Sequence, residues 1–222
     1  MNNQEWIKNN NDILLLSNKN NVEIEGLINF LLANICMETL LGFKPSSLIH
    51  IPKMGDELKV LTILAAVINQ YNCRYEVLHE NNIRLTVLIY HTLTLNHCLL
   101  SRENLDYLKE QGYFIEGFSI NNIFSVIKQK LENYQNNRSK ITLDENHVDD
   151  YPHEIGIVLG YPIEDVLGFI TNRGQNYIIS GCWKVYHNAG SSKKIFQEYH
   201  RIRSEAVKYL IDNNSLPHSI TF

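Results

Sequence analysis

Residues 152–186 constrain the fold more than any other part of the sequence, because turn-forming residues recur there at short intervals. The stretch begins PHEIGIVLGYPIEDVLGFI and ends SGCWKVY. Pro152 suits a first helical position, since its missing N–H would have no partner there. Gly160 can end that helix, because glycine adopts the left-handed conformation without a Cβ clash. The pattern therefore predicts a short helix that stops at Gly160.

A second helix and a strand are expected in the same stretch. Pro162 can begin the helix, and Gly174 can end it. Glu164 and Asp165 fall in its first turn, where carboxylates favour the positive end of the helix dipole. Over residues 177–186 the apolar positions recur with a period of two, which is typical of a strand. The expected unit is a helix, a tight turn, a second helix and a strand.

The rest of the chain alternates helical and strand-like patterns. Asn81 and Asn82 favour a tight turn, which predicts an antiparallel hairpin. We expect an α/β (α+β) fold with a single mixed or antiparallel sheet of about four strands, which includes 46–51, 83–90 and 177–186 and is packed by helices. Further helices are predicted over residues 24–40, 56–71, 101–111, 120–134 and 192–212, and strands over 48–51, 75–79 and 83–90.

The polar segments suggest a simple domain organisation. Residues 1–22 are predicted to be a polar extension with one short helix, and residues 23–222 a single α/β domain. Residues 135–149 are predicted to be a polar linker and the most mobile internal segment. Ile141 and Leu143 are its main aliphatic residues, too few to offset an ordering cost of about 1–2 kcal/mol per residue.

The charge of the chain argues against a nucleic-acid partner. The net charge is −4 and the isoelectric point is about 6.1. Nucleic-acid-binding domains typically concentrate Lys and Arg on one face. Basic residues between positions 193 and 208 could form a local patch, but a solvated helix face is the interpretation we favour.

The cysteines and the apolar segments indicate a reducing compartment. The four cysteines are far apart and form no CxxC pair, which argues against a zinc ribbon, an iron–sulfur cluster or a thioredoxin motif. The N-terminal MNNQEWIKNNN lacks both the basic and the apolar region of a signal peptide. The most apolar window, residues 24–43, contains Glu25 and Glu38, so we expect a buried helix rather than a membrane span. We therefore predict a cytoplasmic protein with no membrane contact.

Several short motifs occur together in one known family. They are CxxTLxGxKPSSL from Cys36, VLIY from Val87, PHEIG with LGYP and ED from Pro152, and GCWKVY from Gly181. On these motifs, residues 30–205 resemble a family of bacterial proteins from anaerobic Firmicutes that is known only as a domain of unknown function. The resemblance implies no activity, because none is assigned to the family. The chain departs from the family pattern at Met37-Glu38, where the family carries an Ala-Pro pair, and at His91, where it carries an Arg.

Cys182 and His153 form the sharpest enzymatic hypothesis. A thiol becomes a nucleophile when a nearby imidazole or cation stabilises its thiolate. Lys184 shares a predicted strand face with Cys182 and could lower its pKa, while Glu154 or Asp165 could orient the imidazole. The alternative is a buried cysteine and a histidine that caps or packs at a helix start. The sequence leaves both interpretations open.

A second group of residues could bind a ligand. Lys44, Ser46 and Ser47 could hold an anion through a charge-assisted hydrogen bond and hydroxyl donors. The segment lacks the glycines of a phosphate-binding loop, and the alternative is a turn from helix to strand. Tyr161 and Lys184 complete the predicted ligand-binding set. We expect Trp183 and Tyr186 to pack in the core, although an aromatic side chain beside Lys184 could also wall a ligand pocket.

No metal site is predicted, because the nine histidines form neither HxH nor HExxH. His91 and His97 flank a predicted loop with Cys98, which is a loose ligand set. We expect a small-molecule-binding protein or enzyme in which His153, Cys182 and residues 44–47 converge on one concave site. The alternatives are a non-catalytic interaction or regulatory module, or an accessory protein linked to a metal or haem. Cofactor, oligomeric state and whether the protein is an enzyme stay open.

Overall fold

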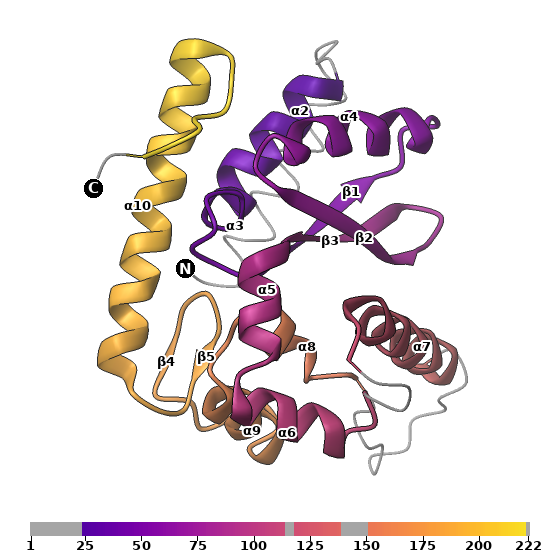
Figure 1. The fold of residues 1–222 in the computed structure, drawn as a ribbon, viewed down its shortest axis with the longest axis vertical. Coiled ribbons are helices and arrows are strands. Elements are labelled where there is room, and N and C mark those ends of the chain that lie inside the picture. Colours follow the sequence, from indigo (N-terminus) through magenta and orange to yellow (C-terminus); the bar gives the residue numbers. More distant parts are fainter. Residues whose placement is uncertain (1–23, 114–117, 139–150, 221–222) are drawn as a thin grey trace.

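A three-stranded antiparallel sheet lies at the centre of the protein (Figure 1). The computed structural model describes residues 24–113, 118–138 and 151–220, and over these ranges the fold is α+β. Strands β1 (Ser46–Pro52), β2 (Cys73–Glu80) and β3 (Arg84–His91) pair in the order β1-β3-β2. The predicted fold class, these three strands and their antiparallel pairing are confirmed.

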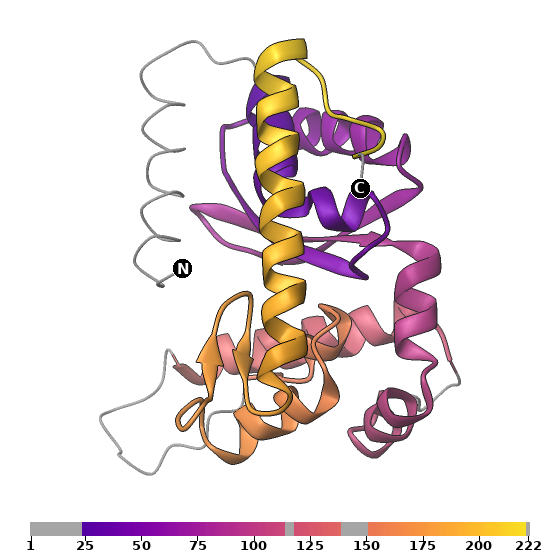
Figure 2. The ribbon, with the colours of Figure 1, turned by 90° about the vertical axis from the view of Figure 1, so that its left-hand side faces the viewer.

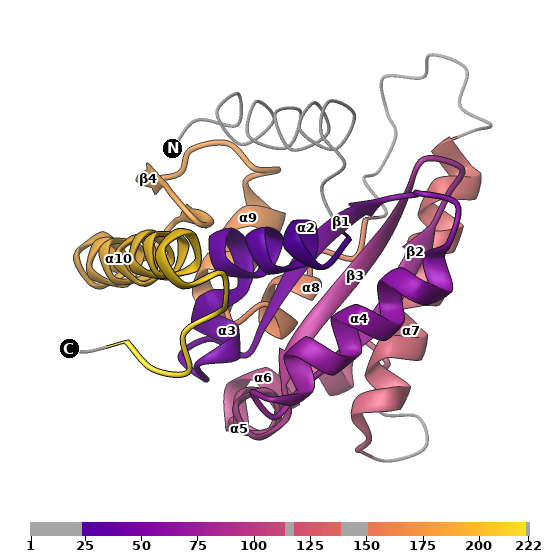
Figure 3. The same cartoon turned by 90° about the horizontal axis from the view of Figure 1, so that it is seen from above.

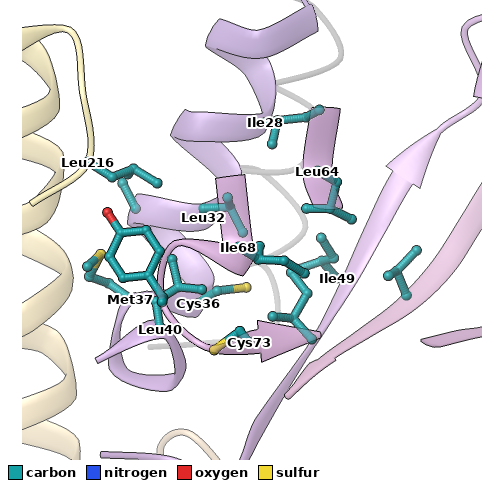
Figure 4. Packing of buried hydrophobic residues seen from close by; sticks show 14 of the residues in the cluster. Ile28, Leu32, Cys36, Met37, Leu40, Ile49, Leu64, Ile68, Cys73 and Leu216 are labelled. Carbon is teal, nitrogen blue, oxygen red and sulfur yellow. The ribbon is translucent and has the colours of Figure 1, made fainter. Parts of the chain in front are cut away.

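The sheet is buried on both faces, because apolar residues occupy both sets of alternating positions. Ile49, Val87 and Ile89 point to one face and form one apolar cluster with helices α2 and α4. Figure 4 shows Ile49 in this cluster with Ile28, Leu64 and Ile68. Leu88 and Tyr90 point to the other face. Figure 3, seen from above, shows α2 and α4 crossing over the strands. The helical layer on the first face is formed by α2 (Ile24–Leu31), the π-helical turn η1 (Leu32–Cys36), α3 (Met37–Leu40) and α4 (Glu57–Asn69).

The second face carries the helices that follow the sheet in sequence. The buried residues of these helices form one apolar cluster with Leu88 and Tyr90. Figure 1 draws α7 and α8 below the sheet, opposite α2 and α4. The helices of this layer are α5 (Thr92–Leu99), α6 (Arg102–Glu110), α7 (Ile120–Arg138) and α8 (Ile155–Val158), followed by α9 (Ile163–Thr171).

Residues 177–186 do not join the central sheet, so that part of the prediction is wrong. They form a separate two-stranded hairpin of β4 (Ile179–Ser180) and β5 (Lys184–Val185). The chain reverses at Gly181, whose N–H donates to the carbonyl of Trp183 at 3.0 Å. Gly181 is required there because a Cβ would overlap the Phe196 ring. The hairpin therefore packs against the last helix rather than against β1.

Helix α10 (Ala189–Asn213) runs past both halves of the protein (Figures 1 and 2). Its first half packs on the hairpin through Tyr199, and its second half packs on the α2–α4 layer through Ile202 and Ala206. The side chain of Asn188 caps it by accepting a hydrogen bond from the Ser191 N–H at 3.3 Å. The helix begins at Ala189, slightly before the predicted residue 192. By packing on both the hairpin and the α2–α4 layer, it joins segments that are far apart in sequence.

Most other predicted helices are confirmed, including the Asp56 cap, which accepts from the Lys59 N–H at 3.0 Å. The segment after β3 is an exception, because α5 replaces the loop predicted between His91 and His97. His91 ends β3 and caps α5, because its Nδ1 accepts a hydrogen bond from the Thr94 N–H at 3.4 Å.

The predicted linker lies mostly, and the predicted N-terminal extension entirely, outside the described residues. Helix α7 extends to Arg138, past its predicted end, while residues 139–149 of the predicted linker and the extension over 1–22 lie outside the described residues. The division into an extension and a single domain stays a prediction. In the described ranges, the helices are all too short or too polar to cross a membrane.

Candidate functional site

A pocket of about 210 Å³ lies where α8, α9 and the β4–β5 hairpin meet. The residues of the 152–186 stretch supply nearly all of its lining. Part of its lining is aliphatic, formed by Ile155, Leu159 and Val166. The rest is mostly aromatic, with one glycine, one carboxylate and one amino group, and consists of Tyr151, His153, Gly156, Tyr161, Asp165, Phe169, Trp183 and Lys184.

The rings form two contiguous groups around this pocket. His153 packs on Tyr151 at a centroid distance of 5.3 Å and on Phe169 at 4.9 Å. Tyr161 stacks on Trp183 at 5.1 Å with an interplanar angle of 26°. Offset or tilted rings at such distances attract each other beyond their apolar burial. The two groups give the pocket flat, apolar walls.

Asp165 fixes one of these walls. Its Oδ2 accepts from the Trp183 indole N–H at 2.7 Å, and its Oδ1 accepts from the backbone N–H groups of Tyr186 and His187 at 2.7 and 2.9 Å. The side chain is buried in the first turn of α9. Three donors therefore satisfy this carboxylate and hold the hairpin on α9. Its observed partner is the Trp183 indole, whereas the sequence suggested the His153 imidazole.

Lys184 is held at the end of α9 by its amino group. The Nζ atom donates to the carbonyl oxygen of Gly174 at 2.7 Å. It also lies over the rings of Phe169 and Tyr177, 5.5 and 5.1 Å from their centroids. A cation over an aromatic face is stabilised by the ring quadrupole. The predicted ligand-binding residues Tyr161 and Lys184 thus both lie on the pocket wall, with His153.

A buried ionic cluster of Glu38, Lys44 and Arg203 lies nearby, between α3 and α10. The Glu38 carboxylate is fully buried and accepts two hydrogen bonds from the Arg203 guanidinium, with Nε–Oε2 at 3.0 Å. Lys44 Nζ lies 3.8 Å from Glu38 Oε1. Burial lowers the pKa of Lys44, while Glu38 acts in the opposite direction. Burial raises the pKa of Tyr161, a residue of the pocket lining, while Arg203 lowers it and Glu38 raises it.

The predicted anion-binding turn lies inside the protein. Lys44 donates to the Ser47 hydroxyl at 3.3 Å, and that hydroxyl lies 2.8 Å from the Thr39 hydroxyl. Ser46 donates to the Val158 carbonyl at 2.7 Å and so joins β1 to α8. These contacts support the interpretation of a turn from helix to strand. The ligand-binding roles of Lys44, Ser46 and Ser47 stay predictions.

Cys182 packs against the apolar cluster of Trp183, Val185 and Tyr199. Burial raises the pKa of its thiol, and Arg203 and Lys44 oppose that rise only in part. These are the cations that act most strongly on it, whereas the sequence suggested Lys184. Lys44 thus affects the pKa of Cys182 and His153 lines the pocket, while the convergence of the three residues on one site stays a prediction. Whether thiol and imidazole act together stays a prediction.

Glu154, the third predicted catalytic residue, forms an ion pair between α7 and α8. Its carboxylate accepts a hydrogen bond from Lys130 Nζ and is buried. Burial and the neighbouring Glu154 also raise the pKa of Tyr113. These contacts place Glu154 on the side of α8 that faces α7, and its catalytic role stays a prediction.

Sequence reasoning missed Glu38 and Arg203 as partners. The charge pattern predicts a solvated helix face for Arg203. Glu38 serves there only as a charged residue that argues against a membrane span over residues 24–43. One signal pointed to Glu38, since a carboxylate inside an apolar helical run needs a partner when that helix is buried. Across the described ranges, no three His, Cys, Asp or Glu side chains are grouped to hold a metal ion.

The thiol of Cys182 is expected to react slowly with iodoacetamide at pH 7.5, because its raised pKa leaves little thiolate. Peptide mass spectrometry after timed alkylation measures the rate, with the unfolded chain in guanidinium as the reference. We expect the folded protein to be at least about 10-fold slower, since both burial and protonation protect the thiol. Modification faster than in the unfolded chain would restore the nucleophile hypothesis.

A second pocket, of about 340 Å³, lies between α4 and β2. Tyr75 is the one aromatic residue in its lining, which also includes Cys73 and Arg74. The pocket at Trp183 has several rings and a carboxylate that fixes one of them. We therefore treat the pocket at Trp183 as the candidate site.

The fold and this pocket define an α+β protein with an aromatic pocket beside its C-terminal hairpin. The chain belongs to the family described as "Protein of unknown function (DUF3793)", which matches residues 32–220. That match confirms the resemblance to a domain of unknown function inferred from the motifs. No curated protein and no solved structure matches the chain.

Proposed function

We propose that the protein binds a small, flat and largely apolar molecule in the pocket at Trp183. The observation that carries the proposal is the pair of aromatic groups around a space of about 210 Å³. Ligand pockets are typically apolar and aromatic with a few placed polar groups, and span about 300–1,000 Å³. This pocket is at or below the small end of that range, so we expect a ligand of one or two rings.

The composition of the walls favours a binding site over a simple core. Cores rarely collect Lys, His and Tyr together, because each polar atom then needs a partner. Here these residues surround an open space rather than a filled one. Asp165 also fixes Trp183 through a hydrogen bond of 2.7 Å. A wall that is already ordered reduces the entropy lost on binding.

Binding is better supported than nucleophilic catalysis. The raised pKa of Cys182 keeps the thiol protonated near neutral pH, and a protonated thiol is a poor nucleophile. Glu154 pairs with Lys130 on another helix. A binding or regulatory role needs neither group to react, and we propose that role for the protein.

Phenylacetamide, a neutral one-ring probe, is expected to change the fluorescence of Trp183 in a saturable way. A Trp6→Phe background leaves Trp183 as the sole tryptophan, since the chain has two. For so small a ligand we expect a Kd of about 1 mM, from the limited free energy available per atom. The measurement is a fluorescence titration at fixed ionic strength.

Two matched variants test where the probe binds. Phe169 lines the pocket, whereas Phe196 contacts Trp183 edge-on, with its ring centroid at 4.5 Å, and is not part of the lining. Phe169→Leu is expected to weaken binding about 5-fold through the loss of ring contacts, and Phe196→Leu to leave Kd unchanged. No saturable change in the parent protein, or equal losses in both variants, would contradict the proposal.

A further inference from the structure

The pocket wall carries two charged side chains whose partners differ. Asp165 is fully engaged, because three N–H donors contact its two oxygens. Lys184 has one hydrogen-bond acceptor, the Gly174 carbonyl. An ammonium has three N–H donors, so two of them have no acceptor among the described residues. The hydrogen-bonding sites of the Asp165 carboxylate are thus largely occupied, whereas two donors of the Lys184 ammonium are not.

The surroundings of Lys184 hold its ammonium without neutralising it. Phe169 and Tyr177 stabilise the cation through their ring faces, and Gly174 contributes only a carbonyl dipole. No carboxylate in the described ranges pairs with Lys184. The side chain is also half-buried. A partly desolvated cation without a counter-ion attracts an anion more strongly than a solvated surface lysine does.

We infer that the ligand is a small aromatic acid whose ring lies among the pocket rings and whose anionic group pairs with Lys184. This inference rests on the proposed function and adds the charge of the ligand to it. Charge-assisted hydrogen bonds from lysine to a carboxylate are among the stronger polar contacts in proteins. The Lys184 ammonium, held beside Phe169, lies at the edge of the ring-lined space.

An aromatic pocket can also select cations, as cages for quaternary ammonium groups do. Here the ring face of Phe169, which lines the pocket, and that of Tyr177, which lies outside the lining, already hold the ammonium of Lys184. A second cation there would be repelled at short range. The rings and the lysine together therefore favour an acid over an amine of the same size.

Three one-ring probes of similar size test this inference: phenylacetate, phenylacetamide and 2-phenylethylammonium. Titration of the Trp183 fluorescence in the Trp6→Phe background gives a Kd for each. Phenylacetate is expected to bind about 10-fold more tightly than the amide, as one charge-assisted contact predicts, and the ammonium more weakly than both. The advantage of phenylacetate is expected to shrink as salt is raised.

Variants of Lys184 test whether this side chain causes the tighter binding of phenylacetate than of phenylacetamide. Lys184→Met keeps the aliphatic stem, so it is expected to retain amide binding and to abolish the advantage of phenylacetate. Lys184→Arg is expected to keep that advantage. Lys193→Met removes an exposed lysine of α10 and is expected to leave all three affinities unchanged. Amide binding by each variant also shows that its pocket is folded.

The outcomes separate this inference from the proposed function. If none of the three probes binds, the proposed function fails and the inference fails with it. If the amide binds the parent protein as tightly as phenylacetate, the inference alone is overturned. The same conclusion follows if Lys184→Met keeps the preference for phenylacetate. The comparison among probes needs only the parent protein, so it holds even if Lys184→Met does not fold.

Discussion

A Glu38→Ala variant is expected to lose about 3 kcal/mol or more of unfolding free energy, because it leaves buried cations without their carboxylate. Glu38 is fully buried and accepts two hydrogen bonds from Arg203, while Lys44 Nζ lies 3.8 Å away. Lys44 is itself buried and cannot readily recover the lost interaction from water. The ion pair of Glu38 and Arg203 joins α3 to α10, so its loss weakens the attachment of the last helix.

A surface ion pair on the same helix provides the matched control. Glu198 pairs with Arg201 on α10, and both side chains keep substantial exposure. Glu198→Ala is expected to change the unfolding free energy far less than Glu38→Ala, because water and salt screen an exposed pair. Urea unfolding followed by circular dichroism measures both variants. An effect of Glu38→Ala no larger than that of Glu198→Ala would show that the buried cluster contributes no net stability.

A Gly160→Ala variant is expected to lose about 2–5 kcal/mol, because a strained backbone and an overpacked contact act together. Gly160 has a φ of +77°, which lies in the left-handed region. A Cβ at this position would lie 2.5 Å from Cδ and 2.7 Å from Cγ of Pro45. Neither ring carbon can move freely, because Pro45 is buried between α3 and β1.

Gly112 separates the two causes, since it has a similar φ of +80° and a Cβ at its position would have no heavy atom of the described residues within 4 Å. Gly112→Ala is expected to lose only the conformational part, about 1–2 kcal/mol. The same urea titration compares the two alanine variants. Equal losses of unfolding free energy would mean that the contact between Gly160 and Pro45 tolerates a methyl group. The turns that contain Gly160 and Pro45 would then not be closely packed.

Local patterns were sufficient to predict most of the elements. Strands β1 and β3 follow from short apolar runs, and Asp56 marks the start of α4 because its side chain caps the helix. The hairpin at 177–186 was missed for a physical reason. Ile179 and Val185 are an even number of residues apart, so they share a face both in one long strand and as partners in a hairpin. Gly181 was the signal for the turn, since glycine weakens a strand interior.

The candidate site could be predicted only in part. His153, Tyr161 and Lys184 were identified because the 152–186 stretch is compact in sequence, and all three line the pocket. Glu38 and Arg203 are 165 residues apart, and no local pattern relates them. Their pairing depends on how α10 packs across the protein, which periodicity does not encode.

The indole N–H resonance of Trp183 reports most directly whether a small molecule occupies the pocket at Trp183. We would record ¹H–¹⁵N spectra of the Trp6→Phe protein while adding phenylacetamide. Because the indole N–H donates to Asp165 within the pocket wall, we predict a saturable shift of this resonance with the Kd found by fluorescence. An unchanged indole resonance, with shifts confined to Cys73, Arg74 and Tyr75 at the second pocket, would contradict the account.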